Sequence, residues 1–395
     1  MKNWLVEAEE LEGYLQLIYK QLHQYPELGF KEYKTKEFIV GELSKGKIPY
    51  RSCGETGLVV EIKGSYPGKT LLLRVDMDAL EIQEQNEFAY ASKNKGIMHA
   101  CGHDAHMTVG LGVAFLFNNL RKNLKGTVKI MFQPAEEAPP GGAVEMIRQG
   151  VLKKPKVDAA ISIHTNPFIK TGQFGLRSGC ILAATDRIYI SLLGKAGHGG
   201  APHQGIDAIV MASQFVANLQ NIVSRQIAPT DNAVITIGKI NGGYRANVIA
   251  DRVDLEGTVR TTKEAVQDEI EQRIEKLLAS VAANWGGDYT YRYQRGYPPT
   301  VNDQKMTELV KQSAMELLGE ESVLELESAL MSGDDFAYIA RAVPSVFIEW
   351  GVGGVEEERF PWHHPRFNVD LSSFKYGVAV VSHSIWSYLE GEREK

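Results

Sequence analysis

The chain has 395 residues, of which 44% are hydrophobic and 23% charged, as in ordinary globular proteins. Since a domain usually has about 100–200 residues, this length favours two domains over one. The formal net charge of -6 is not gathered into a long charged run, which argues against nucleic acid or an anionic membrane surface as a partner. No run of about 18 apolar residues occurs, so we expect no membrane span. The lack of a signal-peptide pattern after Met1, together with three scattered cysteines, favours a reducing cytoplasm.

The first half of the chain alternates between helical and strand-like patterns. Apolar residues at helical spacing predict an opening helix over residues 4–22 and a second helix over 31–43. Strand-like runs follow at residues 58–62, 70–75, 128–132 and 159–164, and a helix is expected at 108–120. This alternation predicts a mainly parallel sheet that helices cover on both faces.

The middle of the chain has a different pattern. Its expected elements are a strand, a helix, two strands, a helix and a strand, at residues 187–193, 207–225, 233–240, 253–260, 264–283 and 289–293. This order is that of a ferredoxin-like split unit. The alternation then resumes, with a strand at 345–350 and a closing helix from Leu371. The sequence therefore predicts an α/β domain, residues 1–185 and 299–395, interrupted by a smaller α+β domain, residues 186–298.

The densest cluster of polar residues lies between the first strands and the helix at 108–120. There Cys101 and His103 flank Gly102, which permits a tight backbone, so both side chains can reach one metal ion. Thiolate and imidazole together suit zinc or a similar transition metal. The alternative is a polar turn that simply precedes a helix, because no second Cys pair is present.

Two adjacent carboxylates, Glu136 and Glu137, directly follow the apolar strand at 128–132. On an irregular backbone they point in different directions, so one can bind a metal while the other faces the reacting water. Water bound to a metal loses its proton easily, but a neighbouring general base must accept that proton. A solvated acidic loop is the alternative.

Further candidates lie where other predicted strands end. His164 ends the strand at 159–164, where open α/β sheets bind ligands, and His363 precedes the last helix. Asp76 and Asp78 follow the strand at 70–75 and can orient a ligating imidazole, although either could cap a turn instead. Each histidine alone could be structural. Coincidence across all five segments is much less probable than a site for two metal ions.

The inserted domain contains a glycine-rich loop with two histidines, His198 and His203. A histidine there could donate a hydrogen bond to a developing oxyanion if the domain closes over the site. The alternative is a flexible turn after a strand. Asn247 is a candidate for contact with a substrate carboxylate or carbonyl, or else a turn asparagine.

These segments resemble the cytosolic metal-dependent amidohydrolases related to aminoacylases, hippurate hydrolase, indoleacetyl-amino-acid hydrolases and thermostable carboxypeptidases. The resemblance spans nearly the whole chain in collinear order, and its Cys-Gly-His-Asp segment is highly specific. The matching segments are residues 23–28, 74–80, 99–104, 133–137, 194–203, 247–249, 257–260, 333–336 and 363–367.

The resemblance implies a fold and roles that spacing alone leaves open. It implies a mixed-sheet, zinc-peptidase-like catalytic domain with an inserted ferredoxin-like lid, through which the chain forms a homodimer or homotetramer. Two divalent metal ions (Zn, Mn, Co or Ni) are implied, with the ligands Cys101, His103, Glu137, His164 and His363. Glu136 is implied as the general base, His198 as the lid histidine that stabilises the tetrahedral intermediate, and Asp76 as a further catalytic residue. Contacts with the substrate are expected from Asn247, His203 and Arg260.

Relatives usually have a His, a variable residue and then Pro, so His363 takes the ligand role in preference to His364. The chain departs from the family pattern at two positions, Ala250 in place of a common Pro and Asp334 in place of a common Glu. Both bear on substrate contacts, and neither removes a ligand or the base.

The function expected on this basis is hydrolysis of the amide bond of N-acyl-L-amino acids. Two enzymatic alternatives use the same metals: a carboxypeptidase acting on short or N-blocked peptides, and a deacetylase of the N-acetyl-diaminopimelate type. A non-enzymatic alternative is an inactive homologue that only binds a metal or ligand, which the complete ligand set and Glu136 argue against. A Rossmann dehydrogenase is disfavoured because no Gly-x-Gly-x-x-Gly follows the early strands.

Overall fold

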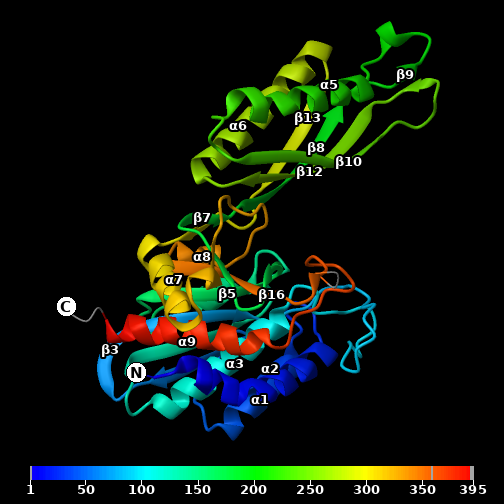
Figure 1. The fold of residues 1–395 in the computed structure, drawn as a ribbon. Coiled ribbons are helices and arrows are strands. Elements are labelled where there is room, and N and C mark those ends of the chain that lie inside the picture. Colours follow the sequence, from blue (N-terminus) through cyan, green and yellow to red (C-terminus); the bar gives the residue numbers. More distant parts are fainter. Residues whose placement is uncertain (1, 357–358, 392–395) are drawn as a thin grey trace. The chain divides into compact units, whose positions relative to one another are not determined.

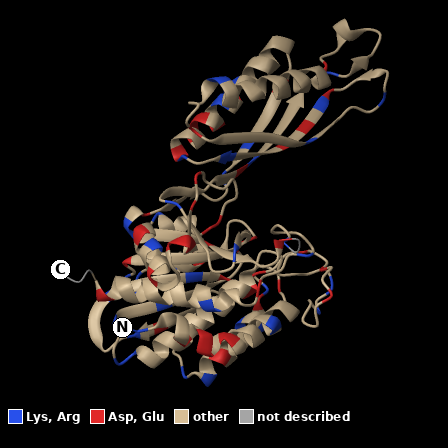
Figure 2. Ribbon diagram, in the orientation of Figure 1, with Lys and Arg blue, Asp and Glu red and all other residues tan. Residues whose placement is uncertain are grey.

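A computed structural model describes residues 2–356 and 359–391 (Figure 1). The chain divides into two compact units. The first comprises the described residues of Met1–Ile181, Val301–Ser328 and Asp335–Lys395, and the second comprises Leu182–Thr300 and Ala329–Asp334. Acidic and basic residues are interspersed over both units (Figure 2). Within the described residues, no helix is both long and apolar enough to cross a bilayer.

The first unit is built on one mixed sheet, whose strands in the described residues have the order β1-β2-β4-β3-β5-β16-β6-β15. The four central strands β4, β3, β5 and β16 are mutually parallel, whereas β1/β2, β2/β4 and β16/β6 are antiparallel. The bounds are β1 (Tyr50–Ser52), β2 (Leu58–Lys63), β3 (Tyr66–Asp76), β4 (Lys125–Gln133), β5 (Ala159–Lys170), β6 (Phe174–Leu176), β15 (Val323–Glu325) and β16 (Ser345–Gly353). The expectation of a mainly parallel sheet therefore holds for its centre, and the mixed sheet implied by the resemblance is observed.

Helices bury the centre of this sheet on both faces. Consecutive residues of β3 from Thr70 to Asp76 are all buried, which explains the unbroken apolar run in the sequence. Alternate strand residues join one core with α1 (Trp4–Gln24), α3 (His103–Leu120) and α9 (Ser373–Glu390), which lie on the same side in Figure 1. The remaining helices of the unit are α2 (Tyr33–Lys45), α4 (Gly142–Arg148), α7 (Gln304–Leu318), η3 (Glu320–Ser322) and α8 (Ala337–Ala340).

The carboxyl ends of the central strands form the edge where the candidate residues lie. β3 pairs with β5 only as far as Arg74 and Ser162, and β5 then continues to Lys170 beside β16. His164 therefore lies inside β5, not at its end as the sequence predicted. It still faces the edge, because β5 has passed the end of its pairing with β3.

The second unit has the βαββαβ order expected from the sequence. Its antiparallel sheet has the order β10-β12-β8-β13, and alternate residues of β8 are buried in a core shared with α5 and α6. Figure 1 shows both helices on one face of this sheet. The bounds are β8 (Ala184–Leu193), α5 (Ala208–Asn221), the π-helix η2 (Ile222–Gln226), β10 (Ala233–Gly242), β12 (Arg252–Thr261), α6 (Glu264–Trp285) and β13 (Asp288–Gln294), with the short elements β9 (Gly197–His198), η1 (Pro202–Gln204) and β11 (Val248–Ile249).

The second unit comprises Leu182–Thr300, slightly more than the expected residues 186–298, and it includes one further segment. Residues 329–334, expected in the larger domain, group with the second unit. They do so because Leu330 accepts a backbone hydrogen bond from Ala183, and Gly333 packs so closely on Thr185 that a Cβ there would lie 2.4 Å from its methyl group. Short strands occur where the chain passes from one unit to the other, at β7 (Gly179–Leu182) and β14 (Thr300–Asn302).

Candidate metal centre

Cys101 and His103 are held by a tight turn into α3. Gly102, between them, has a φ of +84°, which L side chains rarely adopt, and a Cβ there would lie 2.5 Å from Thr165 Oγ1. Thr165 Oγ1 in turn donates a hydrogen bond to the Cys101 carbonyl at 2.9 Å. His103 is the first residue of α3, whereas the sequence predicted a helix start at Thr108. The helix therefore begins at a candidate ligand.

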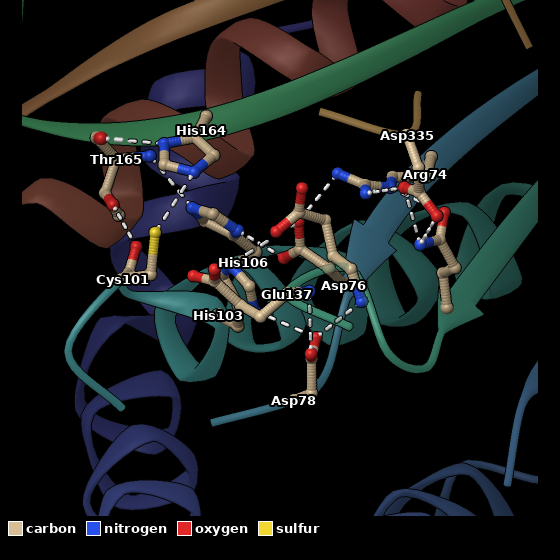
Figure 3. A network of polar contacts seen from close by, with 12 residues as sticks. Arg74, Asp76, Asp78, Cys101, His103, His106, Glu137, His164, Thr165 and Asp335 are labelled. Carbon is tan, nitrogen blue, oxygen red and sulfur yellow. Dashed lines mark hydrogen bonds and ion pairs between the residues drawn. The ribbon is translucent and has the colours of Figure 1, made fainter. Parts of the chain in front are cut away.

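His164 approaches Cys101 from β5. Its Nδ1 lies 3.0 Å from the Thr165 carbonyl oxygen and so carries the proton, and its Nε2 lies 3.6 Å from Cys101 Sγ. Figure 3 shows His164 and Cys101 facing each other, with His103 nearby. One ligand atom from each of Cys101, His103 and His164 lies within 4.8 Å of the other two. This group has the size and composition of a metal site.

Glu136 and Glu137 lie in the loop after β4. Asp78 holds both residues by their backbone, because its Oδ1 accepts from the Glu136 N–H and its Oδ2 from the Glu137 N–H, each at 2.9 Å. Side-chain atoms of His103, Glu136 and Glu137 lie within 4.8 Å of one another. Both adjacent carboxylates therefore reach the cluster around His103.

His363 completes a second group of ligand atoms. Its N–H donates to the Ala100 carbonyl at 2.8 Å, which ties its loop to the Cys101 segment. Its Nε2 lies 3.1 Å from Glu137 Oε1, and Cys101, Glu137 and His363 bring ligand atoms within 4.8 Å of one another. Cys101 is thus common to two groups, which supports two neighbouring ion positions.

His364 has different surroundings from His363. Its ring stacks on Phe360, with centroids 4.6 Å apart, and its Nδ1 accepts a hydrogen bond from the Arg366 N–H at 3.1 Å. Among the described residues, it belongs to none of the groups that could hold a metal ion. The geometry therefore favours His363 as the ligand.

The donor set fits divalent ions of the zinc type. Neither ring nitrogen of the buried His103 makes a hydrogen bond within the described part of the chain. Its Nδ1 has an ion-pair contact of 3.3 Å with Asp78 Oδ1, the arrangement in which a carboxylate orients a ligating imidazole. Thiolate, imidazole and carboxylate donors together suit zinc and similar transition metals.

The charges of the cluster also favour a bound cation. Burial and the nearby carboxylate of Glu137 raise the pKa of the Cys101 thiol well above its ordinary value. Burial would lower the pKa of His103, but the carboxylates of Asp76 and Asp78 raise it to about 10. A buried site with this much negative charge attracts positive charge, which metal ions supply.

Asp76 lies behind the cluster and has two buried partners. Its Oδ1 is 2.5 Å from His106 Nδ1, and its Oδ2 accepts from Arg74 Nη1 at 2.6 Å. Burial lowers the pKa of His106 to about 3, so its ring is neutral. His106 Nδ1 then donates to Asp76, and its Nε2 accepts from the Thr165 N–H at 2.8 Å. Both ring nitrogens are therefore engaged, so His106 positions the backbone next to His164 and is not available as a ligand.

A buried network around Arg74 was not expected from the sequence. This fully buried arginine donates to Gln133 Oε1 at 2.9 Å and to Asp335 Oδ1 at 2.7 Å. Asp335 also accepts the Ala143 N–H at 2.9 Å, at the start of α4. A charged residue inside an apolar strand run was the available signal, together with the matching segment 333–336, to which no role was given.

The candidate residues of the second unit are only partly brought together. Val248, next to Asn247, pairs with His198 where β11 meets β9, and His203 follows in η1. His198, Asn247 and His203 are all exposed. The end of β8 at Leu193, which precedes the His198 segment, pairs with Arg252 at the start of β12. Arg260 lies near the opposite end of β12, where it pairs with Thr185. The structure therefore groups His198 with Asn247 but does not bring Arg260 to them.

Comparisons with known proteins agree with this geometry. A model of peptidase family M20/M25/M40 matches residues 72–387. An N-acetyl-L-cysteine deacetylase of Bacillus subtilis is 39% identical over 389 residues, 98% of this chain and 90% of that protein. An N-acyl-L-amino acid amidohydrolase of Geobacillus stearothermophilus is 40% identical over 284 residues, 72% of this chain and 76% of that protein.

A solved structure shows the same fold at high similarity. It is a dinuclear metal-binding peptidase from family M20 of Bacillus subtilis, with a TM-score of 0.85 and 32% identity, covering 97% of this chain and 99% of that one. The family resemblance and the mixed α/β fold inferred from the sequence are thereby confirmed.

Proposed function

Since the chain belongs to peptidase family M20/M25/M40, we propose that it removes the acyl group from N-acyl-L-amino acids. It is an enzyme that hydrolyses amide bonds with divalent metal ions. The observation that carries the proposal is the convergence of two groups of ligand atoms, which share Cys101, with Glu136 beside Glu137. The names of the two relatives point to small N-acylated amino acids as the substrate class.

The proposed metal ligands are the five side chains that form the two groups around Cys101: Cys101, His103, Glu137, His164 and His363. The ions, of Zn, Mn, Co or Ni, supply Lewis-acid activation of water and of the acyl carbonyl when bound. Glu136 accepts a proton from the attacking water and passes it to the nitrogen of the leaving amino acid. The water oxygen thus forms the new C–O bond and loses a proton, and the amide nitrogen receives that proton from Glu136 as the C–N bond breaks.

The second unit has a proposed role of its own, which rests on the family resemblance. His198 donates to the oxyanion that develops on the acyl oxygen, and Asn247, His203 and Arg260 contact the substrate. The unit also joins two or four chains into a homo-oligomer, and the enzyme works in the cytoplasm, where Cys101 stays reduced. Light scattering after gel filtration tests the oligomer, and a monomer at micromolar concentration would contradict it.

The substrate class is tested with a panel of N-acetyl, N-benzoyl and dipeptidyl amino acids. The metal-stripped protein is reloaded separately with each of the four metals, and release of the free amino acid is measured. We expect turnover of N-acetyl-L-amino acids, including N-acetyl-L-cysteine, with kcat/KM at least about tenfold above that for unblocked dipeptides. A preference for dipeptides would indicate a peptidase, and a preference for N-acetyl-diaminopimelate would indicate the more specialised deacetylase.

A further inference from the structure

The segment 23–35, which comprises the end of α1, the connection to α2 and the start of α2, contacts residues next to the candidate metal ligands. Its first half, residues 23–28, belongs to the segments that carry the family resemblance, but the resemblance implies no role for it. It bonds the first turn of α3 and two loops of the site: His23 Nδ1 lies 2.6 Å from Asp104 Oδ2, the Glu27 carbonyl accepts the Ala79 N–H at 2.8 Å, and Glu32 Oε1 accepts the Ala135 N–H at 2.8 Å. The bond from the Ala135 N–H to Glu32 lies next to the proposed general base, Glu136.

Glu32 is completely buried, and its two carboxylate oxygens have separate partners. Oε1 accepts from the Ala135 N–H at 2.8 Å, and Oε2 accepts from Thr56 Oγ1 at 2.7 Å. Ala135 has a φ of +55°, a left-handed conformation that costs a non-glycine residue free energy and persists only where the surroundings impose it. Glu32 therefore bonds the backbone at the one strained residue of this loop, immediately before Glu136.

Two buried carboxylates together fix three consecutive amides. Glu32 accepts the N–H of Ala135, and Asp78 accepts those of Glu136 and Glu137. The backbone at Gly29 also lies close to this loop. A Cβ added at Gly29 would lie 3.2 Å from both Cα and Cβ of Ala135. The loop is thus bonded by Glu32 and packed closely against Gly29.

We propose that Glu32 is a positioning residue, which fixes the backbone at Ala135 through a hydrogen bond and so keeps Glu136 and Glu137 in their working geometry. The proposal rests on the roles of Glu136 and Glu137 given above. Displacing a catalytic group by about 1 Å costs about 100-fold in rate, so a bond at the adjacent residue has a measurable effect.

The bond, and not the negative charge, is the proposed agent. Burial raises the pKa of Glu32 to about 7, and an oxygen of the acid accepts the Ala135 N–H in either protonation state. Glutamine preserves both contacts, because its amide oxygen accepts from Ala135 and its NH₂ group donates to the Thr56 hydroxyl. Glu32→Gln therefore separates hydrogen bonding from charge.

The test compares Glu32→Ala and Glu32→Gln in the full-length, metal-loaded enzyme. The matched control is Glu42→Gln, because Glu42 is also a buried glutamate but bonds Tyr14 and Lys45. For an N-acetyl-L-amino acid, we expect Glu32→Ala to lower kcat about 100-fold, with KM changed by less than about threefold. Glu32→Gln and the control should stay within about threefold of wild type in both constants.

A second readout does not depend on turnover. Competition with a chelator should show metal affinity about tenfold weaker in Glu32→Ala, because Glu137 moves with the loop, and nearly unchanged in Glu32→Gln. If the wild type is metal-loaded but inactive on every N-acyl amino acid, the proposed function fails, while this readout still tests Glu32. A Glu32→Ala protein with wild-type kcat and metal affinity overturns the positioning role. A Glu32→Gln protein as impaired as Glu32→Ala also overturns it, because charge would then be the agent.

Gly29→Ala provides a variant that removes no hydrogen bond, should Glu32→Ala fail to fold. Its Cβ must push Ala135 by a few tenths of an ångström. We expect kcat to fall about three- to tenfold, with a melting temperature close to that of wild type. An unchanged kcat in a folded, metal-loaded Gly29→Ala protein contradicts the proposal.

Discussion

Replacing Asp78 by Asn tests how the loop that carries Glu136 and Glu137 is held. Each oxygen of Asp78 accepts one backbone N–H at 2.9 Å, and Oδ1 also lies 3.3 Å from His103 Nδ1. Asparagine has a single acceptor oxygen, so its NH₂ group must face one of the two N–H donors. The change loses a charge-assisted hydrogen bond, worth about 1.5–3 kcal/mol, and leaves a buried N–H unpaired, at about 1–3 kcal/mol.

We therefore expect Asp78→Asn to lower the free energy of unfolding of the metal-free protein by about 3 kcal/mol, since the loop relieves part of the total by moving. Loss of the carboxylate that orients His103 should weaken metal binding about 10- to 100-fold. At saturating metal, kcat should still be about 100-fold lower, because Glu136 is displaced. Urea unfolding, chelator competition and steady-state kinetics measure the three effects.

The matched control is Asp158→Asn. Asp158 also accepts a backbone N–H, that of Thr70 at 2.8 Å, but in the first half of β3, whose other end carries Asp76. Asp158 uses only one oxygen for this bond, so asparagine can keep it, and this variant should change stability, metal affinity and kcat little. If Asp78→Asn binds metal and turns over like Asp158→Asn, the loop is not held as the hydrogen bonds indicate.

His363→Ala should lose metal affinity and activity, at least about 100-fold in kcat/KM, while His364→Ala stays within about threefold of wild type; the reverse order in metal titrations would exchange their roles. Gly102→Ala should give a protein with weakened metal binding, because it strains a φ of +84° and places a Cβ 2.5 Å from Thr165 Oγ1; wild-type affinity, measured by chelator competition, would show that the turn can relax. Burial would lower the pKa of His23, but its bonds to two carboxylates raise it from 6.5 to about 9. Its contribution of about 3 kcal/mol is therefore complete below pH 6.5 and is lost as the pH rises through 9; unfolding curves with the same pH dependence in His23→Gln would contradict this.

Periodicity and apolar runs predicted most of the helices and strands, because the buried face of each element determines where its apolar residues occur. The run from Thr70 to Val75 is apolar because β3 is covered on both faces, and the alternation in β8 reflects a sheet covered on one face. The start of α3 was missed, because residues 103–107 are buried on every side of the helix and so show no amphipathic spacing. The length of β5 was missed as well, since it depends on its pairing with β16, which is far away in the sequence.

The candidate ligands could be proposed from the sequence because their chemistry is unusual and their segments are short. The backbone bonds behind them could not, since Asp78 was proposed only as a residue that orients an imidazole and Glu32 was given no role. Glu32 and Asp78 act by accepting backbone N–H groups, and any residue can donate such a bond, so no sequence pattern identifies the partner. His106 sits in the same cluster as His103, and only the structure shows that the Thr165 N–H occupies its second nitrogen.

In the proposed mechanism, Glu136 moves the proton at a site whose metals are held by other residues. Turnover of an N-acetyl-L-amino acid by Glu136→Gln, with the metal content of the same sample measured, tests it most directly. We expect two metal ions per chain, as in wild type, and kcat lower by about 1,000-fold or more. A fully loaded Glu136→Gln protein whose kcat stays within about tenfold of wild type would contradict it.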